Sequence, residues 1–208
     1  EYIFNRSGPM SMGASQLCLF AKSDSSRATP NLQFHVQPIS TDKLGGAALH
    51  DFHAFTPTVA NVRPTSKGEV TIISSDSREN PKIKMNYLST EDDRKVAADG
   101  LKLVRKIVLE SETFKRYFPE EYRPGYEFQS DEELVNEGSK FTQTIFHPVG
   151  TCKMGNDESS VVSDELKVHG IENLRIIDAS VMPNITSGNT NAPTIMIAEK
   201  GADMILNK

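Results

Sequence analysis

Cysteine is scarce in this sequence, and long apolar runs and concentrated basic stretches are absent from it. Two cysteines, Cys18 and Cys152, do not make a disulfide framework, although either one bridge or two free thiols is compatible with the count. No apolar run approaches the roughly 18 residues that cross a bilayer. Lysine and arginine alternate with acidic residues at a net charge of -5, which argues against a nucleic-acid partner.

The first residues of the given sequence do not show the pattern of a signal peptide. The first six residues, EYIFNR, have neither the basic start nor the apolar core of a signal peptide, and they resemble mid-chain sequence. We therefore expect a fragment or one chain of a processed protein. The sequence does not indicate a cellular compartment. The 208 residues, 37% hydrophobic and 25% charged, suit one ordinary globular domain or two small ones.

The first half of the chain alternates apolar and polar residues, as half-buried strands do. Between Pro30 and Pro38 the apolar members are Leu32, Phe34 and Val36. Three further extended segments are predicted, at residues 55–62, 69–74 and 82–87. Because no long helix separates these segments, we expect them to form an antiparallel sheet.

Helical periodicity follows. Ser89 or Thr90 can cap a helix, with Asp92 or Asp93 three residues later. Apolar residues then recur at steps of three and four as far as Val108, which predicts a helix of about 20 residues.

Three more elements are predicted beyond that helix. Ser130 and Glu133 form a second capping pair before a shorter helix, and residues 117–126 are expected to be a loop. Residues 173–178, NLRIID, predict a short strand that ends in an acid. The final helix is predicted over residues 193–206, because proline is favoured in a first helical turn.

His147 begins the segment HPVGTCKMG, which is rich in small residues and shows no periodicity. Rigid, irregular loops often hold functional groups. An imidazole titrates near neutral pH and so suits proton transfer. The alternative is a loop histidine whose ring is satisfied by a backbone carbonyl.

Two further segments are candidates for ligand contacts. Residues 187–194, SGNTNAPT, lead into a helix start, where free N–H groups and a partial positive charge favour an anion. The alternative is a helix capped by Thr190 or Asn191. Asp178 and Ala179 follow the predicted strand, which places them at the carboxyl end of a sheet or in an ordinary Asx turn.

Together these segments resemble the C-terminal region of the glucose-methanol-choline (GMC) oxidoreductase family. The residues that carry the resemblance are HPVGTCKMG, LRIIDASVMP and GNTNAPTIMIAEK, in that order and approximate spacing. It implies an α+β fold in which residues 1–140 form an antiparallel-sheet substrate-binding domain with helices. Residues 141–208 would be a catalytic, flavin-contacting segment. Their strand and helix would belong to a flavin-binding α/β domain whose N-terminal Rossmann part is missing.

The resemblance also implies FAD-dependent oxidation of the CH–OH group of an alcohol. On this basis His147 takes the hydroxyl proton, hydride passes to flavin N5 and Asn191 holds the alkoxide. Asparagine rather than histidine at position 191 leaves His147 as the base of the pair. Five further residues are implied to contact FAD: Asp178, Ala179, Asn189, Pro193 and Thr194. No metal is implied, and the other four histidines match no motif.

One feature of the family is missing from the sequence. GMC proteins bind the ADP half of FAD with a Gly-x-Gly-x-x-Gly loop, and these 208 residues contain none. We therefore expect the chain to act only with an N-terminal FAD-binding portion, in the same gene product or as an associated chain. Its other expected partners are an alcohol and an electron acceptor, either oxygen or a quinone. The segment NTNAPT leans towards the dehydrogenase members.

Three alternatives remain open at this point. Some relatives cleave cyanohydrins as FAD-containing hydroxynitrile lyases, and others are photodecarboxylases. The chain could also be an inactive fragment or an interaction module. The presence of both His147 and Asn191 speaks against loss of the chemistry.

Overall fold

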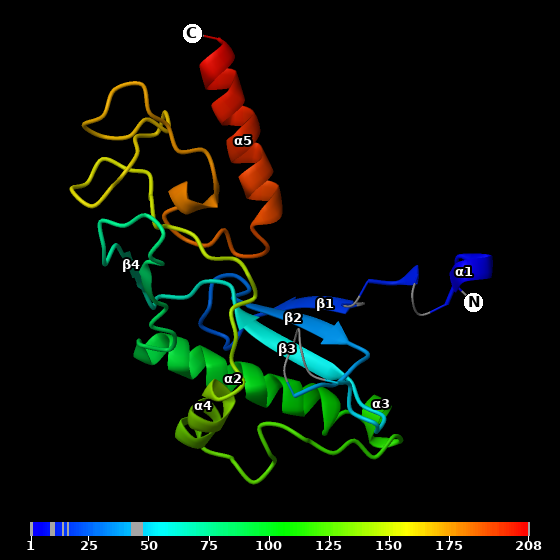
Figure 1. Ribbon diagram of the computed structural model, residues 1–208. Coiled ribbons are helices and arrows are strands. Elements are labelled where there is room, and N and C mark those ends of the chain that lie inside the picture. Colours follow the sequence, from blue (N-terminus) through cyan, green and yellow to red (C-terminus); the bar gives the residue numbers. More distant parts are fainter. Residues whose placement is uncertain (1, 9–10, 14, 16, 43–47, 208) are drawn as a thin grey trace. The chain divides into compact units, whose positions relative to one another are not determined.

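The computed structural model describes residues 2–8, 11–13, 15, 17–42 and 48–207 (Figure 1). The chain forms two compact units. The sheet unit comprises residues 1–61 and 94–142, and the loop unit comprises residues 62–93 and 143–208. The fold is α+β with antiparallel strand pairing, as predicted, but the strands form two separate sheets instead of the single one expected. None of the described helices is long and apolar enough to cross a membrane.

Most of the regular secondary structure lies in the sheet unit. Its elements are α1 (Tyr2–Asn5), β1 (Leu17–Ala21), β2 (Leu32–Gln37), β3 (Thr56–Asn61), α2 (Glu91–Val108), α3 (Glu112–Lys115) and α4 (Asp131–Ser139). The first three residues of α2 belong to the loop unit. The strands predicted at residues 32–36 and 55–62 are therefore confirmed as β2 and β3.

The three strands form one antiparallel sheet in the order β1-β2-β3. Sequence reasoning missed β1, because its residues LCLFA form a continuous apolar run without alternation. Pairing with β2, for example Leu19 opposite Phe34, makes this run a strand. The alternation predicted for β2 is also incomplete, since Gln33 is only 1% exposed and its amide approaches Cys18 Sγ at 3.5 Å.

The core of the sheet unit lies between β2 and α2, which runs along the sheet in Figure 1. Leu32 and Phe34 are buried and cluster with Val96 of the helix. A Cβ atom at Gly100 would lie 2.9 Å from a methyl group of Val59 in β3. The missing side chain at this position therefore lets the helix approach the sheet closely.

The predicted starts of α2 and α4 are confirmed. The Thr90 hydroxyl accepts a hydrogen bond from the Asp93 N–H at 3.2 Å, so that α2 begins one residue after the cap. The Asp93 carboxylate also accepts the backbone N–H groups of Thr65 at 2.9 Å and Ser66 at 2.8 Å. At α4, the reciprocal capping box between Ser130 and Glu133 is complete.

The loop predicted at residues 117–126 is confirmed, and a buried cation attaches it to α2. Arg105 is 7% exposed and pairs with both carboxylate oxygens of Glu121 at 2.7 Å. Its remaining N–H groups donate to the backbone oxygens of Phe128 at 2.7 Å and Gly125 at 2.9 Å. The several N–H donors of the Arg105 guanidinium thus order an irregular segment.

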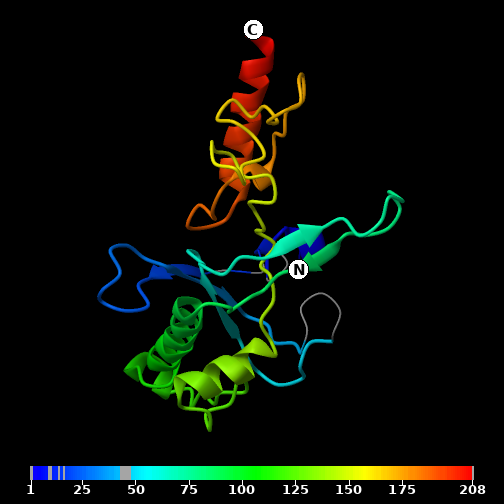
Figure 2. The same cartoon turned by 90° about the vertical axis from the view of Figure 1, so that its left-hand side faces the viewer.

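The loop unit contains little regular structure. Its elements are β4 (Glu69–Thr71), β5 (Lys82–Lys84), the 3-10 turn η2 (Ala179–Val181) and α5 (Asn191–Leu206). The strands β4 and β5 pair as a short hairpin, shorter than the predicted segments 69–74 and 82–87 (Figure 2). Left-handed backbone at Asn86, with φ 54°, interrupts the extended conformation after β5.

A small apolar cluster forms the core of the loop unit. Its buried members are Val162, Leu166, Val181, Met182 and Ile197. They come from the loop after His147, from η2 and from α5. The core of this unit therefore joins loops to one helix instead of joining a sheet to a helix.

The strand predicted at residues 173–178 is wrong. Among the described residues, this segment has one isolated bridge, between Arg175 and Lys167. Two further backbone bonds flank it, from Val168 N–H to Leu174 and from Ile176 N–H to Leu166. An apolar run becomes a strand only when a neighbour offers a continuous ladder, and the neighbouring loop here offers single contacts.

The sequence predicts a boundary between residues 140 and 141, with a substrate-binding region before it and a flavin-contacting region after it. This functional assignment stays a prediction. As compact units, residues 62–93 group with the C-terminal segment and not with the rest of the predicted substrate-binding region. The C-terminal helix is confirmed but begins at Asn191, two residues before the predicted start.

Candidate functional site

The loop that begins at His147 is held in place by backbone hydrogen bonds to η2. The N–H groups of Gly150 and Cys152 both donate to the Ser180 carbonyl at 3.1 Å, and the Met154 N–H donates to the Val181 carbonyl at 2.8 Å. Gly150 has φ +90°, a conformation that side-chain-bearing residues rarely adopt. The glycine therefore allows the turn through which the loop reaches η2.

Both ring nitrogens of His147 contact the segment that precedes α5. Nδ1 lies 2.9 Å from Thr190 Oγ1 and 3.4 Å from the Thr190 backbone N. Nε2 lies 2.8 Å from Asn189 Nδ2. The imidazole is half-buried, whereas Thr190 is only 7% exposed. The alternative of a ring satisfied by a backbone carbonyl is therefore wrong for this histidine, because side chains of residues 189 and 190 contact both nitrogens.

Thr190 occupies the N-cap position of α5, but its side chain does not cap the helix. Its hydroxyl is directed to His147 instead. The Thr190 carbonyl accepts both the N–H of Thr194 at 3.0 Å and the hydroxyl of Thr194 at 2.7 Å. The two hydrogen bonds from Thr194 thus order the first turn of α5. The Thr190 side chain does not cap the N-terminal N–H groups of this helix.

Asp178 caps η2 instead of ending a strand. Its Oδ1 accepts the Ser180 N–H at 2.7 Å, the Asx turn that the sequence allowed. Its side chain is exposed, while Ala179 is partly buried against the core of the loop unit. Because η2 packs against α5, the candidate residues around Asp178 and at the helix start belong to one substructure.

The structure thus joins the three sequence motifs through hydrogen bonds and packing. His147 and Asn189 are in direct contact. Asn191 and Pro193 lie in the first turn of α5, where Asn191 is exposed and Pro193 is half-buried. Sequence reasoning missed Thr190 as a site residue, since a threonine before a helix is usually read as a cap. The only signal was its place between two candidate asparagines.

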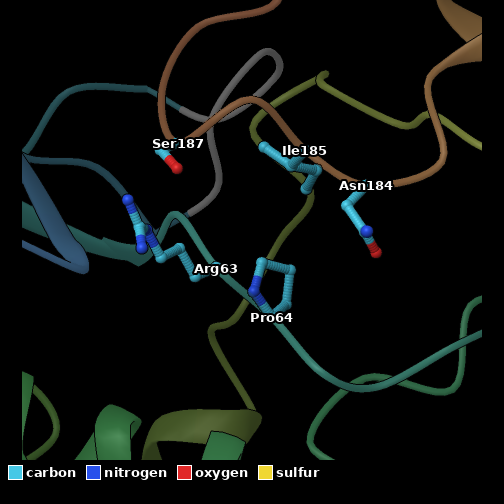
Figure 3. Close-up of a pocket in the computed structure, with 5 residues that line it drawn as sticks. All are labelled: Arg63, Pro64, Asn184, Ile185 and Ser187. Carbon is cyan, nitrogen blue, oxygen red and sulfur yellow. The ribbon is translucent and has the colours of Figure 1, made fainter. Parts of the chain in front are cut away.

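A pocket of about 430 Å³ lies beside the segment that leads to this site. Its lining consists of Arg63, Pro64, Asn184, Ile185 and Ser187 (Figure 3). In Figure 3 the Arg63 guanidinium extends towards the side of Ser187, away from Asn184. Asn184 Oδ1 accepts a hydrogen bond from Lys67 Nζ at 2.7 Å. None of the predicted site residues lines this pocket.

Other chemically capable side chains have local structural partners. His50 stacks on Phe52 with ring centroids 4.8 Å apart and contacts Ser40 Oγ at 2.9 Å. His169 Nε2 lies 3.0 Å from the Gly155 carbonyl. Both cysteines are free thiols, which resolves the choice that the sequence left open. These two histidines, which match no motif, thus have partners within the fold.

Comparison with known proteins gives close relatives for the whole chain. The chain is 40% identical over 208 residues to an alcohol dehydrogenase (acceptor) of Pseudomonas putida, covering 100% of this chain and 37% of the relative. It is 42% identical over 205 residues to an oxygen-dependent choline dehydrogenase of Proteus mirabilis, covering 99% and 37%. The chain thus spans little more than a third of the curated relatives' length.

Solved structures share the fold. A formate oxidase from Aspergillus oryzae, studied for modification of its FAD, superposes with a TM-score of 0.85 at 27% identity. The similarity covers 99% of this chain and 40% of that one. The family model of GMC oxidoreductases matches residues 64–198, which include every predicted site residue and more than half of the sequence. This chain therefore belongs to the GMC oxidoreductase family.

Proposed function

We propose that this chain carries the proton-accepting part of an FAD-dependent oxidoreductase that acts on the CH–OH group of an alcohol. The observation that carries the proposal is the position of His147, whose ring is held at the uncapped start of α5 by Thr190 and Asn189. A general base and a helix N-terminus in one place suit the removal of a proton from a group that becomes negatively charged.

The residues present fit a flavin. The N-terminus of α5 offers backbone N–H groups and the positive end of a 16-residue helix, and Thr190 does not cap it. Such a helix end favours an electron-rich edge like that of a reduced flavin. Asn191, Pro193 and Thr194 would hold the ring there. Bound FAD would supply the hydride acceptor at N5.

A second contact is proposed at Asp178. One of its carboxylate oxygens caps η2, and its side chain is exposed, so it can still accept a hydrogen bond from a sugar hydroxyl. Asp178 and Ala179 would therefore contact the ribityl–pyrophosphate part, with Asn189 contributing from the segment before α5. The ADP half would be bound by an N-terminal portion of the protein, outside these 208 residues.

In the proposed reaction, the hydroxyl proton of the alcohol passes to His147. The C–H bond of the carbinol carbon breaks as hydride leaves, and the oxygen becomes a carbonyl. Asn191, a neutral amide donor, would stabilise the negative charge on the oxygen as the proton departs. The electrons would later pass to oxygen or to a quinone-type acceptor, and the names of the curated relatives leave both open, since one is an alcohol dehydrogenase (acceptor) and the other an oxygen-dependent choline dehydrogenase.

Anaerobic reduction of the flavin tests this function. The complete FAD-loaded protein would be mixed with a panel of alcohols, including choline, while the flavin absorbance is followed. We expect bleaching by at least one alcohol, and His147→Ala should slow it by at least about a hundredfold, the low end for loss of a general base. His53→Ala, which changes an exposed histidine of the sheet unit, is the matched control.

Two results would contradict the proposal. An unchanged rate of reduction in His147→Ala would remove this residue from the chemistry. If no alcohol bleaches the flavin, while cyanohydrin cleavage or light-dependent loss of carbon dioxide from a fatty acid is detected, the protein is a lyase or photodecarboxylase relative.

A further inference from the structure

We infer that Thr190 is a positioning residue that fixes the tautomer of His147, keeping the proton on Nδ1 and the lone pair on Nε2. We also infer that the side-chain amide of Asn189 covers this lone pair until an alcohol hydroxyl takes its place. The inference deepens the proposed function by naming the atom that accepts the proton.

A neutral imidazole has one N–H and one lone pair, so its two nitrogens cannot both accept hydrogen bonds. In this structure both nitrogens face polar groups: Thr190 at Nδ1 and Asn189 at Nε2. A threonine hydroxyl can donate or accept, whereas an amide nitrogen can only donate. The pairing that satisfies both side chains as placed has Nδ1–H donating to Thr190 Oγ1 and Asn189 Nδ2–H donating to the Nε2 lone pair.

The distances support this assignment. The 2.9 Å between Nδ1 and Thr190 Oγ1 is a normal hydrogen-bond length. The Thr190 backbone N–H also faces Nδ1, but at 3.4 Å it lies beyond the range of 2.7–3.2 Å that is usual for N–H donors. The hydroxyl is therefore the stronger partner of Nδ1, and because it can accept a hydrogen bond, it allows Nδ1 to carry the proton that the donor-only Asn189 amide excludes from Nε2.

The buried position of Thr190 keeps its hydroxyl beside Nδ1 of His147. Thr190 is 7% exposed, and its carbonyl is bound by the Thr194 N–H and hydroxyl of the first turn of α5. The Thr190 oxygen that faces His147 is thus placed by the helix start itself. Asn189 is exposed, so a substrate hydroxyl can approach Nε2 and take the place of its amide there.

The tautomer can be measured without any turnover. In the complete protein carrying ¹⁵N-histidine, the His147 resonances are identified by their loss in His147→Ala. We expect Nδ1 to show an attached proton and Nε2 to have the shift of an unprotonated imidazole nitrogen. An Nε2-protonated neutral ring in the unmodified protein would overturn the inference. Because this measurement needs no substrate, it separates failure of this inference from failure of the proposed reaction.

Variants at position 190 test the cause. Thr190→Val keeps the shape of the side chain but removes the hydroxyl, so the proton should move to Nε2 and flavin reduction should slow by about tenfold, the loss of one hydrogen bond. Thr190→Ser should restore both the tautomer and the rate. Thr186→Val removes an exposed hydroxyl from the same loop and is the matched control.

The results divide clearly. If Thr190→Val reduces the rate but leaves the proton on Nδ1, Thr190 has only a structural role and the inference is wrong. Asn189→Ala should shift the Nε2 resonance towards that of a nitrogen without a hydrogen bond. If the Nε2 resonance does not change in this variant, the Asn189 amide does not bind the Nε2 lone pair and this part of the inference is wrong.

Discussion

The two units of this protein are ordered in different ways. In the sheet unit, strands pair over five or six residues and α2 packs on them through Val96. In the loop unit, isolated bridges and single hydrogen bonds connect irregular segments around a small apolar cluster. The candidate site lies in the second kind of structure. Its geometry therefore depends on individual contacts, such as those of Ser180 and Thr190, more than on a repeated ladder.

The helix α2 shows the same contrast at its two ends. Near its C-terminal end, Arg105 is paired with a charged partner, the Glu121 carboxylate. At its first turn, Asp93 accepts hydrogen bonds from the neutral N–H groups of Thr65 and Ser66. Both side chains are buried and both attach an irregular segment to the helix. The loss of each should therefore destabilise its own unit, by different amounts and with different responses to pH.

The largest effect is expected from Arg105→Met. The substitution removes a buried cation, so the Glu121 carboxylate loses its charged partner and two carbonyl oxygens lose the donors that Arg105 supplies. Breaking one side of a buried ion pair costs about 3–5 kcal/mol in the free energy of unfolding. Urea denaturation followed by circular dichroism measures this loss. Lys102→Met breaks an exposed pair with Asp131 and should cost under about 1 kcal/mol; equal losses would show that burial does not matter here.

A smaller effect with a pH dependence is expected at Asp93. Burial raises the pKa of this carboxyl, but hydrogen bonds from Ser66 and Thr65 outweigh burial and hold the pKa below its ordinary value of 3.8. The charged form is thus favoured by folding. Its contribution is complete above the ordinary carboxyl pKa and is lost as the pH falls through the depressed value.

Asp93→Asn should therefore cost about 1–3 kcal/mol at neutral pH, because one of the two accepting oxygens becomes an NH2 donor that faces the N–H group of residue 65 or 66. The difference in stability between the two proteins should shrink as the pH falls below about 4. Thermal unfolding from pH 7 to pH 2.5 measures this difference. A gap that stays constant down to the lowest pH would contradict the role assigned to the charge.

The smallest effect is expected at a glycine of α5. A Cβ atom at Gly201 would lie 2.6 Å from Cγ2 and 2.8 Å from Cδ1 of Ile177. Overpacking of this kind costs roughly 1–3 kcal/mol, while the better helix propensity of alanine returns about 1 kcal/mol. Gly201→Ala should therefore destabilise the protein by about 1 kcal/mol in chemical denaturation.

Gly138→Ala in α4 is the control for this prediction. Its nearest neighbour, Leu101 Cδ1, would lie 3.3 Å from the new Cβ atom and can move slightly. This variant should be neutral or slightly stabilising. A larger loss here than at Gly201 would mean that close packing in the loop unit is more adaptable than packing in the sheet unit.

Local features of the fold were predictable because they depend on neighbours in sequence. The capping box at Ser130, the cap at Thr90 and the strand at residues 32–37 follow from side chains a few positions apart. Predictions failed where a distant partner decides. The run at residues 173–178 is not a strand because its neighbours offer single bonds, and β1 is one because β2 pairs with it.

The same division holds for the candidate site. The sequence by itself determined the family, through three motifs whose order and residue types it records, and it identified His147, Asn189 and Asn191 as candidates. Only the tertiary structure decided that Asn189 and Thr190 contact the ring of His147, since 42 and 43 residues separate them along the chain. A cap is a local interaction and can be predicted locally. The hydrogen bond between Thr190 and His147, which forms instead of a cap, requires the distant loop that begins at His147. That loop is bound to η2, and η2 packs on α5.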